Sequence, residues 1–138
     1  MSEILLKTIE LNATNEGPHL LMSAGVHGDE FEPMVVARRL TGLLGDQLIQ
    51  GHVAIVPVSN EVAFARSAPT AKDGLDLARI CPGRVDGSIT EQAGAAISGL
   101  IEKVDFLIDL HAGGKLHKIL PLAKLCVRAT CLVKSSMC

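Results

Sequence analysis

Apolar residues follow two kinds of spacing along the chain. Short, nearly continuous apolar runs predict strands that are buried on both faces, and apolar residues three or four positions apart predict helices. The expected strands span residues 19–24, 52–58 and 105–110, with a looser edge or half-buried strand over residues 4–11. The expected helices span residues 33–44 and 90–103.

The ends of the two helices carry signals of their own. Pro33 suits a first helical turn, and Gly45 suits the position just after the last turn. Thr90 is expected to cap the second helix through its hydroxyl oxygen. Residues 61–88 are rich in Ala, Gly, Pro and Asp and have no sustained period, so we expect a long functional loop there.

The elements alternate in the order strand, helix, strand, long loop, helix and strand. This order predicts the α/β class, with a mainly parallel or mixed sheet and helices on both faces. In such sheets, ligands bind beyond the carboxyl ends of the strands. His27 and His111, each flanked by glycine-bearing sequence, follow expected strands at such ends.

Composition narrows the classes of protein. The 138 residues suffice for one domain, and 48% hydrophobic with 20% charged residues excludes a disordered chain. The net charge of −2 and the pI of about 6.2 give no electrostatic reason to expect a nucleic-acid or anionic-membrane partner. No apolar run approaches roughly 18 residues, and the first residues lack signal-peptide character, so we expect a cytoplasmic location.

Positive charge and cysteine are concentrated toward the end of the chain. Residues 1–109 carry 15 acidic and 8 basic side chains, whereas residues 110–138 carry five basic side chains and no acidic one. Because no aromatic residues accompany these cations, we expect a solvated end and no nucleic-acid site. Three of the four cysteines lie in residues 126–138, at spacings that match no standard zinc motif.

Three residues form the candidate chemical group. His27 and Glu30 lie three positions apart at a strand-to-helix junction, where an imidazole and a carboxylate can converge, and His111 ends a separate strand. Two histidines and one carboxylate, with a fourth position open to water, are typical of catalytic zinc sites. The spacing alone leaves open that both histidines are hydrogen-bonded structural residues.

Three sequence blocks resemble the succinylglutamate desuccinylase/aspartoacylase family, a branch of the zinc carboxypeptidase-like hydrolases. The blocks read GVHGDE at residues 25–30, DGLDLARICPG at residues 73–83 and IDLHAGG at residues 108–114. They occur in the family's order. The resemblance implies a zinc carboxypeptidase-like fold, of which this chain supplies the N-terminal part.

The resemblance also implies roles for individual residues. His27, Glu30 and His111 match the family's Zn²⁺ ligands, and Asp76 matches the aspartate that orients the first zinc histidine. The positive side chains that match the family's substrate contacts are Arg66, for the scissile carbonyl, and Arg79, for a substrate carboxylate. The alternative to a role at the site is that Arg66 is a solvated charge on a loop and that Asp76 is an ordinary aspartate in a turn.

The chain departs from the family pattern in two places. Ala78 replaces the asparagine of the family's Asp-x-Asn-Arg motif, so the amide that would grip a substrate carboxylate is missing. No Asp or Glu follows Asp109, although the family carries a downstream glutamate as general base. We therefore expect a zinc hydrolase-like α/β domain over residues 1–123, an atypical tail over residues 124–138, and a truncated form of a longer enzyme.

The resemblance implies a zinc-dependent hydrolase that cleaves an amide bond in a small N-acylated, amino-acid-like substrate. Without the general base, little or no turnover is expected. The alternatives are a non-catalytic zinc-binding remnant and an α/β interaction domain with structural histidines. No nucleic-acid or membrane partner is expected. A homo-oligomer could cover apolar surface and strand edges that such a short chain would leave open.

Overall fold

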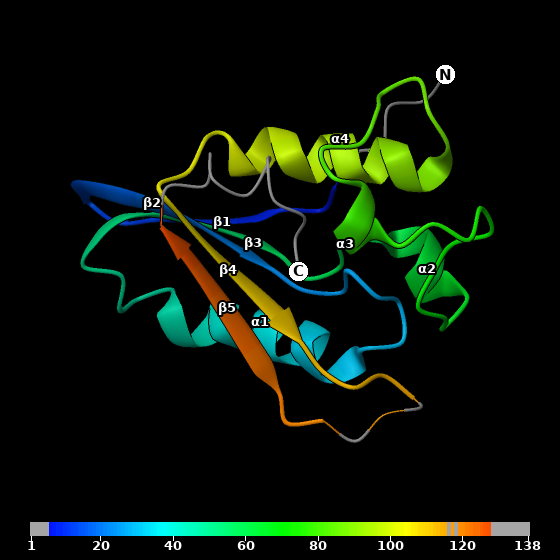
Figure 1. The fold of residues 1–138 in the computed structure, drawn as a ribbon. Helices are drawn as coiled ribbons and strands as arrows, with labels where there is room; N and C mark the ends of the chain where they lie inside the picture. The colour runs from blue at the N-terminus through cyan, green and yellow to red at the C-terminus, as the bar shows by residue number, and fades with distance from the viewer. Residues whose placement is uncertain (1–5, 116, 118, 128–138) are drawn as a thin grey trace.

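The computed structural model describes residues 6–115, 117 and 119–127. Its centre is a five-stranded mixed sheet in the order β1-β3-β2-β4-β5, with helices packed against both faces (Figure 1). The strands are β1 (Ile9–Asn12), β2 (Asn15–Ser23), β3 (Gln50–Val56), β4 (Phe106–His111) and β5 (Leu122–Val127). The helices are α1 (Phe31–Leu44), α2 (Glu61–Ala65), α3 (Leu77–Ile80) and α4 (Ile89–Ile101).

β2 is the middle strand and pairs in parallel with β3 on one side and β4 on the other. Its pairing with β4 places Ser23 opposite Asp109, so the carboxyl ends of the two strands lie next to each other. The outer strands β1 and β5 run antiparallel to their neighbours. The arrangement confirms the predicted α/β class and the mixed sheet.

Successive residues of the strands enter two different cores, because side chains alternate across a sheet. Leu21, Ala54 and Leu107 pack on one face with α3 and α4. Met22 and Ile55 pack on the opposite face, with Ala37 of α1. This double burial explains why β2, β3 and β4 appear in the sequence as continuous apolar runs.

The structure corrects three details of the sequence-based expectations. Residues 61–88 contain the short helices α2 and α3. Ser88, and not Thr90, caps α4 by accepting a hydrogen bond from the Glu91 N–H, while the Glu91 carboxylate accepts one from the Ser88 N–H. The Thr90 N–H and hydroxyl instead donate to Asp73. A cap two residues upstream could be read from the Ser-x-x-Glu pattern.

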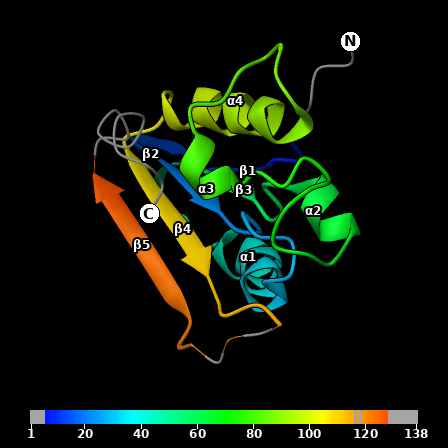
Figure 2. The same cartoon turned by 45° about the vertical axis from the view of Figure 1, so that its right-hand side comes forward.

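The third correction is β5, for which the sequence predicted no strand. It crosses the expected boundary after residue 123 and forms one edge of the sheet, on the side away from α2 (Figure 2). Its half-buried positions are Lys124 and Cys126, while Leu125 and Val127 are exposed, so its apolar residues do not show the alternation that predicts a half-buried strand. Residues 128–138 of the expected tail lie outside the described residues.

Candidate metal centre

The loop that carries His27 and Glu30 continues directly from β2. Backbone hydrogen bonds extend the β2–β3 pairing past the strand ends, from Ser59 N–H to Ala24 O and from Asn60 N–H to Gly25 O. Gly25 has φ +64°, a left-handed conformation that favours glycine. The chain therefore turns sharply at this point and directs the next residues across the carboxyl end of the sheet.

Gly28 allows this loop to lie against α2. A Cβ atom at Gly28 would stand 2.1 Å from the Ala63 carbonyl carbon and 2.2 Å from the Phe64 nitrogen, so a side chain does not fit. Asn60 holds α2 in place, because its Oδ1 accepts a hydrogen bond from the Ala63 N–H. The glycine between His27 and Asp29 is thus a packing requirement.

Asp29 links the same loop to the segment after β4. Its buried carboxylate accepts a hydrogen bond from the Lys115 N–H at 3.3 Å. Gly114, with φ +59°, lets the backbone pass close by, since a Cβ there would stand 2.5 Å from Asp29 Oδ2. Two loops that are some 85 positions apart in sequence are therefore held side by side.

His27, Glu30 and His111 converge around the Glu30 carboxylate. Glu30 Oε1 lies 2.9 Å from His27 Nδ1, and Glu30 Oε2 lies 3.3 Å from His111 Nδ1. Oε2 also accepts a hydrogen bond from the Ala112 N–H at 2.9 Å. The three side chains are 23%, 9% and 11% exposed, in the order His27, Glu30, His111. A potential ligand atom from each lies within 4.8 Å of the others.

A second carboxylate holds each imidazole from its outer side. His27 Nε2 lies 3.1 Å from Asp76 Oδ1, and His111 Nε2 lies 2.7 Å from Asp109 Oδ2. The Ser23 hydroxyl donates to the other oxygen of Asp109 at 2.6 Å. With both Nε2–H groups donated outward, the two Nδ1 atoms face Glu30 together. This is the orientation that metal-binding histidines adopt when a carboxylate fixes the ring.

The electrostatics of the group favour protonated imidazoles around an ionised glutamate. The hydrogen bond with Glu30 is the largest cause that raises the pKa of His27 above its ordinary value. Hydrogen bonds with Asp109 and Glu30 raise the pKa of His111 to about 10, against the effect of burial. Burial also opposes ionisation of Glu30, but hydrogen bonds from His111, His27 and the Ala112 N–H outweigh it and lower its pKa to about 2.

The donor set suits a zinc ion. Zinc prefers imidazole nitrogen and carboxylate oxygen, and a cation between the two Nδ1 atoms would take the place of protons at this position. Among the described residues, this is the one group of three histidine, cysteine or carboxylate side chains with converging ligand atoms. The residues that could hold the ion are therefore those that the sequence predicted.

The two arginines lie farther from the centre. Arg79, on α3, donates from Nε to Asp76 Oδ2 at 3.2 Å and is 76% exposed, so Asp76 joins this arginine to His27. Arg66 is exposed at the C-terminal end of α2, and none of its contacts with described residues reaches Glu30 or either histidine. Ala78 is buried, and its N–H donates to Asp76 Oδ1.

A family model of the succinylglutamate desuccinylase/aspartoacylase catalytic domain matches residues 16–137. The chain belongs to this family. Among curated relatives, the N-alpha-acetyl-L-2,4-diaminobutyric acid deacetylase of Halomonas elongata is 38% identical over 110 residues, which are 78% of this chain and 32% of the deacetylase.

Solved structures have the same fold over the part that this chain covers. An aspartoacylase family protein from Mesorhizobium loti superposes with a TM-score of 0.72 at 39% identity, over 77% of this chain and 34% of that one. The product-bound ectoine utilization protein EutE (DoeB) from Ruegeria pomeroyi gives 0.72 at 29% identity, over 80% and 34%. The chain thus spans about a third of the length of these relatives.

Sequence reasoning missed Asp109 as a residue of the centre. Its signal was present, because residues two apart on a strand point to the same face, and Asp109 precedes His111 by two positions on β4.

No helix among the described residues is long and apolar enough to cross a membrane.

Proposed function

We propose that this chain carries the Zn²⁺ site of an amide hydrolase that acts on small N-acylated, amino-acid-like compounds. One observation carries the proposal: His27, Glu30 and His111 converge at the carboxyl end of the sheet, with both Nδ1 atoms directed at the same carboxylate. Family membership supports the reaction class, and the deacetylase relative supports an acylated amino acid as substrate.

His27, Glu30 and His111 would hold the ion, and Asp76 and Asp109 would keep both imidazoles oriented. When bound, zinc supplies Lewis acidity, which polarises a carbonyl and lowers the pKa of water. Arg79, exposed beside Asp76, would pair with an anionic group of the substrate. Arg66 would stabilise negative charge on the carbonyl oxygen after rotation of its exposed side chain toward the centre.

The substrate terminus follows from Ala78. An alanine cannot donate the amide hydrogen bonds of the family's asparagine, and Ala78 is buried in the core that α3 and α4 form with the sheet. Arg79 alone would then fix the anionic end of the substrate. We therefore propose a weaker requirement for a free carboxylate than in members that keep the asparagine.

The described residues supply no obvious general base. Glu30 faces both histidines, while Asp76 and Asp109 each accept a hydrogen bond from an imidazole. Loss of a general base lowers rates by roughly 10²–10⁴-fold. We propose that the chain by itself binds zinc and turns over N-acyl substrates slowly.

Hydrolysis of N-acetyl-2,4-diaminobutyrate, N-succinylglutamate and N-acetylaspartate by the purified chain with added Zn²⁺ tests the proposal. We expect slow, zinc-dependent release of one acyl group that disappears in His111→Ala. Zinc-independent hydrolysis, or hydrolysis that His111→Ala retains, would contradict it. Rates as fast as those of a full-length relative would contradict the slow turnover that we propose from the lack of a general base, but not the zinc-dependent reaction.

A second candidate function is a metal-binding domain without catalysis. The engagement of Asp76 and Asp109 with imidazoles favours it, because neither carboxylate is left to activate water. Zinc binding that needs His27 and Glu30, together with no detectable hydrolysis of the three substrates, would select this candidate.

A further inference from the structure

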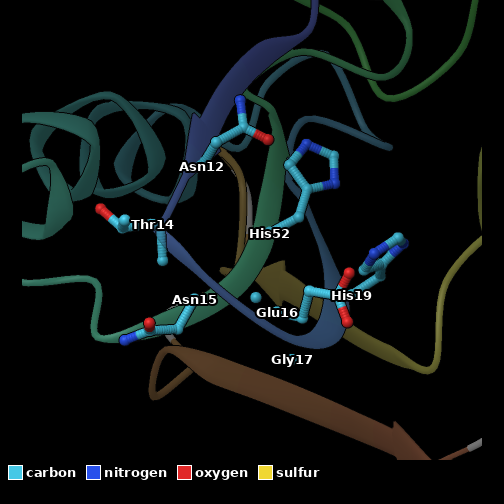
Figure 3. A pocket seen from close by; sticks show the side chains of 9 residues that line it. Asn12, Thr14, Asn15, Glu16, Gly17, His19 and His52 are labelled. Carbon is cyan, nitrogen blue, oxygen red and sulfur yellow. The ribbon is translucent and has the colours of Figure 1, made fainter.

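A polar cavity of about 370 Å³ opens at the other end of the sheet, where β2 and β3 begin (Figure 3). Its lining includes Asn12 of β1, Glu16 and His19 of β2, and His52 of β3. No lysine or arginine contributes to the lining. We propose that this cavity binds a divalent transition-metal ion through His19 and His52, as a site separate from the centre at His27, Glu30 and His111.

The two histidines are neighbours on parallel strands. The β2–β3 register pairs His19 directly with His52, so both side chains leave the same face of the sheet. Figure 3 shows them on adjacent strands, with Asn12 of β1 beyond His52. Strand pairing, rather than a loop, thus fixes the backbone positions from which both side chains extend.

The spacing of the rings suits a shared ion. Their centroids lie 5.4 Å apart. Two imidazoles that bind one ion through nitrogens about 2.0–2.1 Å away have ring centres roughly 5 Å apart. The His27–His111 pair, at 5.8 Å, gives a comparison within the same chain. His19 and His52 stand edge to face at 84°, so one ring must rotate for both lone pairs to converge.

The surroundings permit that rotation and favour a cation. The His19 side chain is exposed and its ring makes no hydrogen bond with the described residues, so it can turn. His52, 27% exposed, is held by a hydrogen bond between Nε2 and Glu10, which leaves Nδ1 as the ligand atom. Two further carboxylates are at hand: Glu16 lines the cavity, and Asp105 accepts a hydrogen bond from the His19 N–H.

The chemistry of the donors identifies the class of ion. Two imidazoles with nearby carboxylates and open water positions suit Zn²⁺, Ni²⁺ or Cu²⁺, whereas Mg²⁺ and Ca²⁺ require mainly oxygen ligands. With only two histidines as strong ligands, the site should bind more weakly than the three-ligand centre.

Calorimetric titration of the chelator-treated full chain with Zn²⁺ tests the inference. Wild type should bind one zinc ion tightly, at the carboxyl end, and a second zinc ion more weakly. Both His19→Ala and His52→Ala should lose the weaker equivalent of zinc and keep the tighter one. Glu10→Gln should weaken the weaker equivalent about tenfold, because it loosens the orientation of His52. His117→Ala, which removes an exposed histidine outside both sites, is the matched control and should leave both equivalents unchanged.

The outcomes separate this site from the proposed function. None of the variants changes a cysteine, so zinc bound by thiols contributes equally to all of them. The test therefore compares zinc binding between variants. If His19→Ala and His52→Ala bind zinc as wild type does, the inference is wrong, whatever happens at Glu30. If Glu30→Ala leaves zinc binding unchanged while His52→Ala removes one equivalent, the inference stands and the proposed zinc centre fails.

Discussion

The two ends of the sheet each bring a pair of histidines together, but they treat the pair differently. At the carboxyl end, His27 and His111 are largely buried, and each imidazole lies between two carboxylates. At the amino end, His52 has one carboxylate partner and the exposed His19 ring has none among the described residues. Similar ring spacings therefore accompany very different degrees of preorganisation.

The difference follows from the topology. Parallel pairing brings the carboxyl ends of β2 and β4 together, and the loops beyond them are fastened by Asp29 and by the packing of Gly28 on α2. At the amino end, strand register aligns the two histidines, and Glu10 holds the His52 ring. Loops fixed by buried polar contacts add ligands and orienting groups that pairing by itself does not supply.

The largest effect is expected from removing the carboxylate that both buried imidazoles share. Glu30→Ala should weaken zinc binding at the carboxyl end by about 100-fold or more, equivalent to about 3 kcal/mol, because one of three ligands is lost. Glu32→Ala, which removes an exposed acid two positions away, should have no such effect. Calorimetry compares the two, and equal affinities in both variants would contradict a role of Glu30 as ligand.

A change in packing should destabilise the carboxyl end of the sheet without removing a proposed metal ligand. Gly28→Ala places a methyl group within van der Waals overlap of the Ala63 backbone, so we expect a loss of about 1–3 kcal/mol in the free energy of unfolding. Gly42→Ala, inside α1 with open space around its Cβ, should instead add about 0.5–1 kcal/mol. Urea denaturation measures both, and a neutral Gly28→Ala would show that α2 can move away.

The sequence was sufficient for the parts of the molecule in which one physical pattern dominates. Continuous apolar runs located β2, β3 and β4, and the glycine-bearing ends of two of these strands located His27 and His111. The convergence of these histidines on Glu30 could be expected because parallel strands share an end. The family comparison confirms the resemblance on which the expected site rested.

The remaining parts depend on contacts that periodicity does not encode. The half-buried face of β5 carries Lys124 and Cys126, while Leu125 and Val127 are exposed, so the apolar residues of this strand do not mark its buried side. The ion pair between Asp76 and Arg79 joins the N-cap of α3 to a residue of that helix, and the composition of residues 61–88 had predicted a loop there. Asp109 lies within an apolar run, and its hydrogen bond from the Ser23 hydroxyl forms only once β2 and β4 are paired.

A smaller effect is expected from changing an orienting carboxylate alone. Asp109→Asn removes the charge beside His111 Nε2 and should weaken zinc binding about 10- to 100-fold, because the imidazole loses part of its orientation and basicity. The exposed Asp86→Asn is the control and should bind zinc as wild type does. If Asp109→Asn also matched wild type, the buried carboxylate would have no part in holding the ligand, and the two ends would differ less than their structures suggest.

The smallest effect, counted per pH unit, is expected for the pH dependence of zinc binding at the carboxyl end, measured in a His19→Ala/His52→Ala background. The pKa of His111 is raised to about 10, so its imidazole holds a proton near pH 7 that zinc must displace, and the raised pKa of His27 favours a second such proton. Glu30, with a pKa of about 2, is already ionised and releases none. Affinity should therefore rise with pH, about tenfold per unit for each proton displaced, and level off only above about pH 10. Titrations in buffers of different ionisation enthalpy should count between one and two protons released at pH 7. An affinity that stays constant between pH 6 and pH 8 would mean that the ion binds elsewhere than between these two imidazoles.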